Sequence, residues 1–181
     1  GRTALHCAAK TGHIKSMQAL LQGGVNPNIK DAMGGPPIHR AVDENELAAV
    51  DFVLQHKANC NYTDNWGRNI LHAAALTART QILRLLLVTC KDLNVNAQGN
   101  DGETPLHDAV RGDHYWTAKT LLEFGARTDV LNKSGRTPGL GWAAALGNLE
   151  ACKRLVKAGA PIQLKSTNGM TPIQVAKNYG H

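Results

Sequence analysis

The stretch GETPLHDAV, residues 102–110, decides the fold, because three close copies precede it in the same chain. These copies begin at Gly1 (GRTALHCAA), Gly34 (GGPPIHRAV) and Gly67 (GRNILHAAA), and fainter ones begin at residues 135 and 169. The steps between the first glycines are 33, 33, 35, 33 and 34 residues. A fixed period in this range indicates a repeat architecture, in which each copy is one supersecondary unit.

Each copy carries the chemistry of two short helices. Thr104 is a good helix N-cap, and Pro105 suits the first helical position, where no backbone N–H is needed. Small side chains such as Ala109 follow and let neighbouring helices approach closely. Gly12 and Gly125 stand after apolar runs and predict the two helix ends, because glycine tolerates positive φ. We therefore expect helix, turn, helix and a hairpin-like loop in every unit.

This period and the Thr-Pro-Leu-His wording resemble the ankyrin repeat, and the resemblance covers the whole chain. It implies an all-α ankyrin-repeat solenoid, in which stacked units bury a continuous core. We expect a single domain over residues 1–181 that is a fragment of a larger protein. Its units are residues 1–33, 34–66, 67–101, 102–134, 135–168 and a partial unit at 169–181.

Two places depart from the pattern. The 35-residue step puts two extra residues near Thr89–Asp92, which we interpret as a tolerated loop insertion. In the fifth unit, Gly139-Leu140-Gly141 stands where other copies have Leu-His. Glycine in the first turn of a helix costs about 1 kcal/mol relative to alanine. We expect a distorted or mobile first turn there, without the bonding role of the motif histidine.

The histidines do not indicate a metal site. His6, His39, His72 and His107 occupy one motif position. Stacked copies lie roughly 10 Å apart if helix-packing distances apply, which is too far to share a zinc ion. The resemblance implies that this histidine is a structural hydrogen-bonding residue that links neighbouring loops.

The four cysteines indicate reduced thiols. None forms a C-x-x-C pair, and a chain of this length needs no disulfide framework. We expect Cys7, Cys60 and Cys152 to be small core or partly buried residues, and Cys90, in the insertion, to be the exposed thiol. Reduced thiols place the protein in the cytosol or nucleus. Because the chain has no phosphate-loop, G-x-S-x-G or H-E-x-x-H motif, we expect no enzyme, metal or cofactor.

Composition and charge narrow the class of partner. Hydrophobic residues make up 43% of the 181 residues, yet no apolar stretch approaches the roughly 18 that a membrane span needs. The net charge of +6 is banded, with +3, −3, +2, −1 and +4 in successive units and +1 in the tail. Banding argues against a phosphate-tracking stripe, and therefore against nucleic acid as a partner. The acidic second unit weakly favours a basic partner, which the overall charge opposes.

A surface for binding a protein or peptide is the leading interpretation. The resemblance implies contacts through the loop tips and the inner face of the first helices. We expect Trp66 and Arg68 near the centre, because Trp and Arg are typical hot-spot residues. Two alternatives stay open: a regulatory ankyrin protein that sequesters a transcription factor, and a passive structural spacer. The candidate partner-binding residues are Met33, Asp43, Glu44, Asn65, Trp66, Arg68, Leu76, Asn100, Asp101, Glu103, Arg111, Lys133, Arg136 and Trp142.

Overall fold

The structure is a computed structural model, and it describes residues 1–112, 114–135, 139–145, 147, 149–157, 159–165 and 169–181. The regular secondary structure of these ranges is helical, and the β pairing within them is one isolated bridge between Thr63 and Asn69. The expected all-α class is confirmed. The helices are α1 (Ala4–Lys10), α2 (Ile14–Gln22), α3 (Pro37–Asp43), α4 (Leu47–Gln55), α5 (Ile70–Leu76), α6 (Thr80–Thr89), α7 (Pro105–Arg111), α8 (Tyr115–Glu123), α9 (Leu140–Ala145), α10 (Leu149–Lys157) and α11 (Pro172–Asn178).

The repeated motif starts the first helix of a unit as its chemistry predicts. Thr104 is the N-cap of α7, and its side chain accepts from the backbone N–H of His107. The ring of His107 in turn accepts from the backbone N–H of Thr104 at 3.1 Å. Pro105 occupies the first helical position, and Asn69 caps α5 in the same reciprocal way. These boxes satisfy backbone donors that a helix N-terminus leaves unpaired.

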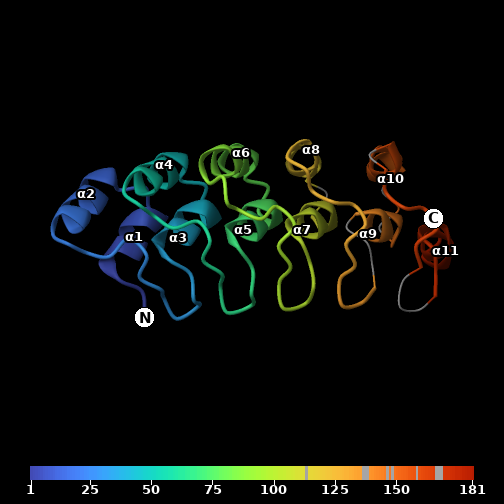
Figure 1. Ribbon diagram of the computed structural model, residues 1–181, viewed down its shortest axis with the longest axis horizontal. Helices are drawn as coiled ribbons and strands as arrows, with labels where there is room; N and C mark the ends of the chain where they lie inside the picture. Colours follow the sequence, from blue (N-terminus) through green and yellow to red (C-terminus); the bar gives the residue numbers. More distant parts are fainter. Residues whose placement is uncertain (113, 136–138, 146, 148, 158, 166–168) are drawn as a thin grey trace. The chain divides into compact units, whose positions relative to one another are not determined.

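The chain divides into two compact units, Gly1–Leu93 and Asn94–His181, and each is described by itself. In the first unit, α1, α3 and α5 lie side by side in one layer, while α2, α4 and α6 form a second layer (Figure 1). In the second unit, α9 packs between α7 and α11, while α8 packs on α7 and α10 on α9. In the first unit, the hairpin-like loops extend from the layer of α1, α3 and α5 (Figure 1). A single domain over the whole chain stays a prediction.

An aliphatic core joins the two layers of the first unit. Leu5, Ile38 and Leu71 lie fully buried on the first helices, and Met17 and Leu86 lie fully buried on the second helices. Burying a side chain of this size stabilises the fold by roughly 1.5–3 kcal/mol. The scarcity of aromatic residues is therefore no obstacle to a packed interior.

The motif histidine links neighbouring repeats, as expected. Nε2 of His6 lies 3.1 Å from the carbonyl oxygen of Gly35, in the next repeat. The other ring nitrogen accepts from the backbone N–H of Thr3. Since both ring nitrogens serve the backbone, His6 is a structural residue.

The fifth repeat, residues 135–168, departs from helical geometry at Gly139, where its glycines predict a departure. Gly139 has a φ of 85°, and α9 begins only at Leu140. A right-handed helix requires negative φ, so no regular helix runs through Gly139. A Cβ at this position would also lie 2.6 Å from the side chain of Leu155. The distortion is confirmed at Gly139, whereas Pro138 lies outside the described residues.

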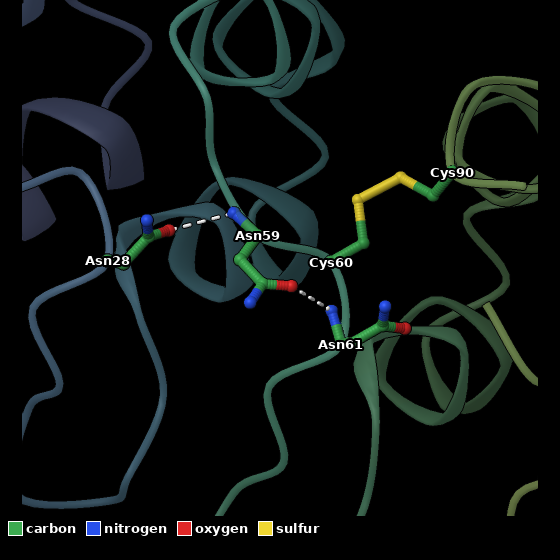
Figure 2. The surroundings of a disulfide bond; sticks show 5 residues. All are labelled: Asn28, Asn59, Cys60, Asn61 and Cys90. Atoms are coloured by element: carbon green, nitrogen blue, oxygen red, sulfur yellow. Dashed lines mark hydrogen bonds between the residues drawn. A yellow bond between two sulfur atoms is a disulfide. The ribbon is translucent and has the colours of Figure 1, made fainter. Parts of the chain in front are cut away.

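Two of the four cysteines differ from the expectation of reduced thiols, whereas Cys7 and the partly buried Cys152 are free. Cys60 and Cys90 form a disulfide between the second and third repeats, with Cα atoms 6.4 Å apart (Figure 2). The prediction of Cys90 as the exposed thiol is therefore wrong. The loop after α6 brings Cys90 beside the loop after α4, within the Cα separation that a disulfide can bridge. Cys7 is exposed on α1 rather than partly buried.

No helix within the described ranges is long and apolar enough to cross a membrane. The same residues contain no cluster of three or more His, Cys, Asp or Glu side chains that could hold a metal ion.

Candidate partner-binding cleft

Two loops of the first unit are closed by an aspartate in the same way. Oδ1 of Asp31 accepts from the backbone N–H of Met33 at 2.9 Å and from that of Gly35 at 3.2 Å. One repeat later, Oδ1 of Asp64 accepts from the backbone N–H groups of Trp66 and Arg68, both at 2.9 Å. The carboxylates therefore fix the backbone on which Met33 and Trp66 stand.

The two loop tips contact each other directly. The backbone N–H of Asn65 donates to the carbonyl of Met33 at 3.1 Å, and its side-chain amide donates to the carbonyl of Ala32 at 3.0 Å. A Cβ at Gly34, whose φ is 81°, would lie 2.4 Å from Oδ1 of Asn65. Glycine is therefore required both by the turn and by this close approach. The tips of the first two loops thus form one continuous surface.

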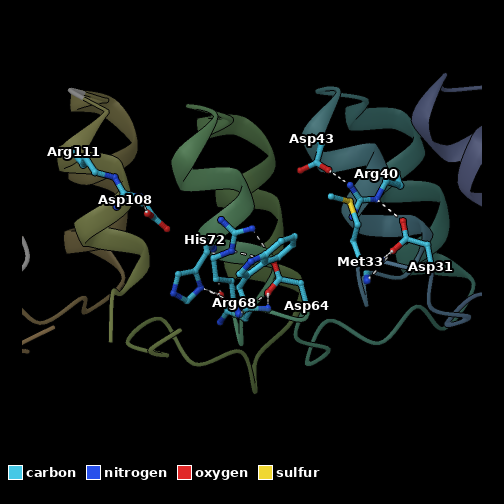
Figure 3. A network of polar contacts seen from close by, with 12 residues as sticks. Asp31, Met33, Arg40, Asp43, Asp64, Arg68, His72, Asp108 and Arg111 are labelled. Atoms are coloured by element: carbon cyan, nitrogen blue, oxygen red, sulfur yellow. Dashed lines mark hydrogen bonds and ion pairs between the residues drawn. The ribbon is translucent and has the colours of Figure 1, made fainter. Parts of the chain in front are cut away.

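Trp66 is held at its loop tip by a charged neighbour. The guanidinium carbon of Arg68 lies 5.0 Å from the centre of the Trp66 ring, in a cation–π arrangement. Nε and Nη2 of Arg68 are each 3.0 Å from Oδ2 of Asp64 (Figure 3). Trp66 as a whole is 48% exposed, so it is positioned without being buried.

A cleft opens beside Trp66, between the two loops and helices α3 and α5. It has a volume of about 200 Å³. Its apolar rim consists of Trp66, Met33 and Leu76, and the last two are 41% and 38% exposed. We call this the loop cleft. The residues that line it are Met33, His39, Arg40, Asp43, Asp64, Trp66, Arg68, Asn69, Ala73, Leu76 and Thr77.

The charges around the loop cleft are paired. Nη1 of Arg40 donates to Asp43 at 2.7 Å, and its Nε lies 3.2 Å from Oδ2 of Asp31 (Figure 3). Burial alone would raise the pKa of Asp31, but Arg40 and two backbone N–H donors outweigh it, so the pKa is lowered. Burial raises the pKa of Asp43, and the nearby carboxylate of Glu44 adds to this rise, although Arg40 opposes it. Burial first, and then Arg40, lowers the pKa of His39 to about 4, so the ring is neutral at pH 7.

Five of the fourteen predicted binding residues line this one cleft, namely Met33, Asp43, Trp66, Arg68 and Leu76. Asn65 joins the two tips, and the exposed Glu44 pairs with Lys10 at 3.3 Å. Sequence reasoning did not select the other lining residues His39, Arg40, Asp64, Asn69 and Ala73. The signal for Asp64 was available, since Asp31 and Asp64 both stand three residues before a motif glycine.

The remaining predicted residues belong to the second unit. Asn100, Asp101 and Lys133 are exposed on loops, and the backbone N–H of Lys133 donates to the carbonyl of Asp101 at 3.0 Å. This bond repeats the contact between the loop tips of the first unit. Arg111 is half-buried and forms an ion pair with Asp108.

Glu103 is not placed to meet a partner. It is only 6% exposed, and one carboxylate oxygen accepts from the side-chain amide of Asn132 at 2.9 Å. Its other oxygen lies 3.6 Å from the ring of His107. Its selection as a contact residue is corrected for this reason. Arg136 and the side chain of Trp142 lie outside the described residues.

Comparison with known proteins agrees with this geometry. A family model described as ankyrin repeats (3 copies) matches residues 1–64 and 38–132, and the chain therefore belongs to the ankyrin-repeat family. The resemblance read from the sequence is confirmed.

The chain is also similar to parts of three longer proteins of different kinds. The chain is 29% identical to the human transient receptor potential cation channel subfamily A member 1 over 99% of the chain and 16% of that protein. It is 26% identical to palmitoyltransferase AKR1 of Lachancea kluyveri over 96% of the chain and 24% of that protein. It is 30% identical to human neurogenic locus notch homolog protein 1 over 87% of the chain and 6% of that protein. The chain thus spans less than a quarter of each relative.

Proposed function

We propose that this chain is a non-enzymatic interaction module, and that a partner protein or peptide binds it at the loop cleft. Ankyrin repeats generally mediate protein–protein interaction and are generally non-enzymatic, which supports the class of function. The half-exposed ring of Trp66, fixed by Arg68 and Asp64, carries the choice of site. The exposed tips at Asn100, Asp101 and Lys133 are proposed as additional contacts.

The energetics favour this cleft as the centre of binding. Asp64 already orders the loop backbone, so a partner meets little of the entropic cost of fixing Trp66. Covering the exposed parts of Trp66, Met33 and Leu76 would remove apolar surface from water. Tryptophan and arginine side chains at the centre of an interface commonly dominate its binding energy.

The competing functions have less support. A passive spacer has no need of three exposed apolar side chains in one cleft, whereas clustered apolar exposure is typical of an interaction site. A nucleic-acid ligand needs unpaired basic groups, but Arg40 and Arg68 are both paired with carboxylates. Sequestration of a transcription factor is a narrower form of the same proposal. The expected location in the cytosol or nucleus was argued from reduced thiols, and this argument is weakened because Cys60 and Cys90 form a disulfide.

The test compares two exposed tryptophans of the same chain. Trp66→Ala should weaken binding of the partner about 30-fold, which corresponds to about 2 kcal/mol at a hot spot. Trp116→Ala is the matched control, because Trp116 is 65% exposed on α8 in the second unit. Arg68→Glu should lose the same partner as Trp66→Ala.

The measurement is a pull-down from lysate with the three variants, followed by calorimetry with the purified partner. Circular dichroism establishes that each variant is folded. Equal affinity of the wild-type chain and a folded Trp66→Ala variant would refute the proposed site.

A further inference from the structure

The rim of the loop cleft is apolar at positions that are polar in other copies of the repeat. The residue before the motif glycine is Met33 and Trp66 in the first two copies, and Asp101 and Ser134 in the next two. The loop cleft therefore lies between the two copies whose tips are both apolar.

The last residue of the first helix follows the same trend. It is Leu76 in α5, but Lys10, Asp43 and Arg111 in α1, α3 and α7. Leu76 completes the apolar rim together with Met33 and Trp66. Three residues at two repeat positions that vary from copy to copy are thus apolar together at one cleft.

Apart from the buried His39, the polar side chains that line the loop cleft are engaged within the protein. Asp43 and Asp64 each bind an arginine that also lines the cleft. The hydroxyl of Thr77 donates to the carbonyl of Ala73 at 2.8 Å, and Oδ1 of Asn69 accepts from two backbone N–H groups of α5. A charged side chain entering the cleft would have to lose its hydration or displace one of these pairs.

We infer that the loop cleft takes one uncharged, apolar side chain, of the leucine, methionine or phenylalanine kind, from an extended segment of the partner. This inference rests on the proposed function and names the chemistry of its central contact. The charge balance supports it, because the cleft contributes two arginines and two aspartates that pair with each other. The small volume, about 200 Å³, suits a single side chain rather than a helix face.

Capped tripeptides test the inference without knowledge of the partner. Acetyl-Gly-X-Gly-amide, with X as Leu, Phe, Lys or Glu, is titrated into the ¹⁵N-labelled chain while the indole N–H signals are followed by NMR. The Trp66 signal is assigned by its loss in Trp66→Phe. The Leu and Phe peptides should shift the Trp66 signal in a saturable way and leave that of Trp116 unchanged. The Lys and Glu peptides should bind at least about tenfold more weakly.

A charge placed in the rim should reverse this preference. Leu76→Asp should abolish binding of the Leu peptide and permit binding of the Lys peptide. Leu131→Asp is the matched control, because Leu131 is 41% exposed in the second unit and should leave the order unchanged. Tighter binding of the Lys or Glu peptide to the wild-type chain overturns the inference. So does an equal response of Trp116, or the absence of a saturable shift with all four peptides.

The two proposals fail in different ways. If the purified partner depends on Trp66 but keeps its affinity when its apolar anchor candidates are replaced by serine, the inference fails and the proposed function stands. If the partner binds Trp66→Ala with the same affinity as the wild-type chain, the proposed function fails, whichever tripeptides bind.

Discussion

Replacing Asp64 by alanine removes the group that holds the second loop. Its Oδ1 accepts from the backbone N–H groups of Trp66 and Arg68, both at 2.9 Å. Hydrogen bonds to a charged group contribute roughly 1.5–3 kcal/mol, and we take about 1 kcal/mol each because the loop meets solvent. The ion pair with Arg68, whose side chain is 32% exposed, adds about 0.5 kcal/mol after solvent screening. Asp64→Ala should therefore destabilise the loop by about 2–3 kcal/mol.

Asp64→Asn separates the hydrogen bonds from the charge. An asparagine keeps a carbonyl acceptor, and Asn132 fills the same place in the second unit, where its Oδ1 accepts from the N–H of Ser134 at 2.9 Å. We expect this variant to lose only about 0.5–1 kcal/mol.

Amide hydrogen exchange measures the difference at the loop itself. In Asp64→Ala, the amide protons of Trp66 and Arg68 should exchange about 30-fold faster, or more, than in the wild-type chain. In Asp64→Asn they should stay within a few-fold of it. Urea unfolding followed by circular dichroism reports any global cost. Equal exchange rates in the two variants would show that the hydrogen bonds of Asp64 do not hold the loop, and would remove the argument for a preorganised Trp66.

Three further predictions concern stability. Folding lowers the pKa of His39 from 6.5 to about 4, so the folded state disfavours protonation of this ring. Up to about 3 kcal/mol of stability, fully present above pH 6.5, should be lost as the pH falls to about 4. The midpoint of urea unfolding should follow this loss, and His39→Gln should make the midpoint less dependent on pH. Reduction of the disulfide, or the double variant Cys60→Ser with Cys90→Ser, should lower the free energy of unfolding by about 3 kcal/mol. Thiol titration of the unfolded wild-type chain should find two thiols before reduction and four after it, and four thiols before reduction would contradict the disulfide. Thr104→Ala should cost about 1 kcal/mol through loss of the cap, whereas Pro36→Ala, which removes no side-chain cap, should not show this loss in thermal unfolding.

The fold could be predicted because its determinants are local and repeated. Thr104 and Pro105 define the start of a helix within two residues, and the three preceding copies of the motif begin their first helix at the same position. The glycine at position 139 carried its own signal, since a φ of 85° is a conformation that glycine alone adopts without strain. Such features depend on a few neighbouring residues and do not require knowledge of the tertiary contacts.

The site was predictable only in part. Met33, Trp66 and Leu76 stand out by comparison of repeats, because each is apolar where other copies are polar. The burial of Glu103 depends on Asn132, which is 29 residues away. The disulfide depends on how the end of α6 places Cys90 beside Cys60 of the preceding repeat, and the extra residues of the 35-residue step gave no indication of this. Contacts between residues of different repeats cannot be predicted from the residue spacing within one repeat.

The acidic second repeat, residues 34–66, shows why charge counting alone misleads about the partner. Its formal charge of −3 favoured a basic ligand when only the sequence was considered. Three of its five acidic residues, Asp43, Glu44 and Asp64, each form an ion pair with a basic side chain of the same or an adjacent repeat. Two of those basic residues, Lys10 and Arg68, come from adjacent repeats, so the stacking of units neutralises the band.

Selectivity at the loop cleft then depends on the groups that stacking leaves exposed, and these are the side chains of Met33, Trp66 and Leu76. A basic partner would have to compete with Arg40 and Arg68 for carboxylates that are already bound. An apolar anchor has no such competitor, because it displaces only water from the rim. The same ion pairs that weaken the case for a basic transcription-factor segment therefore strengthen the case for an uncharged contact.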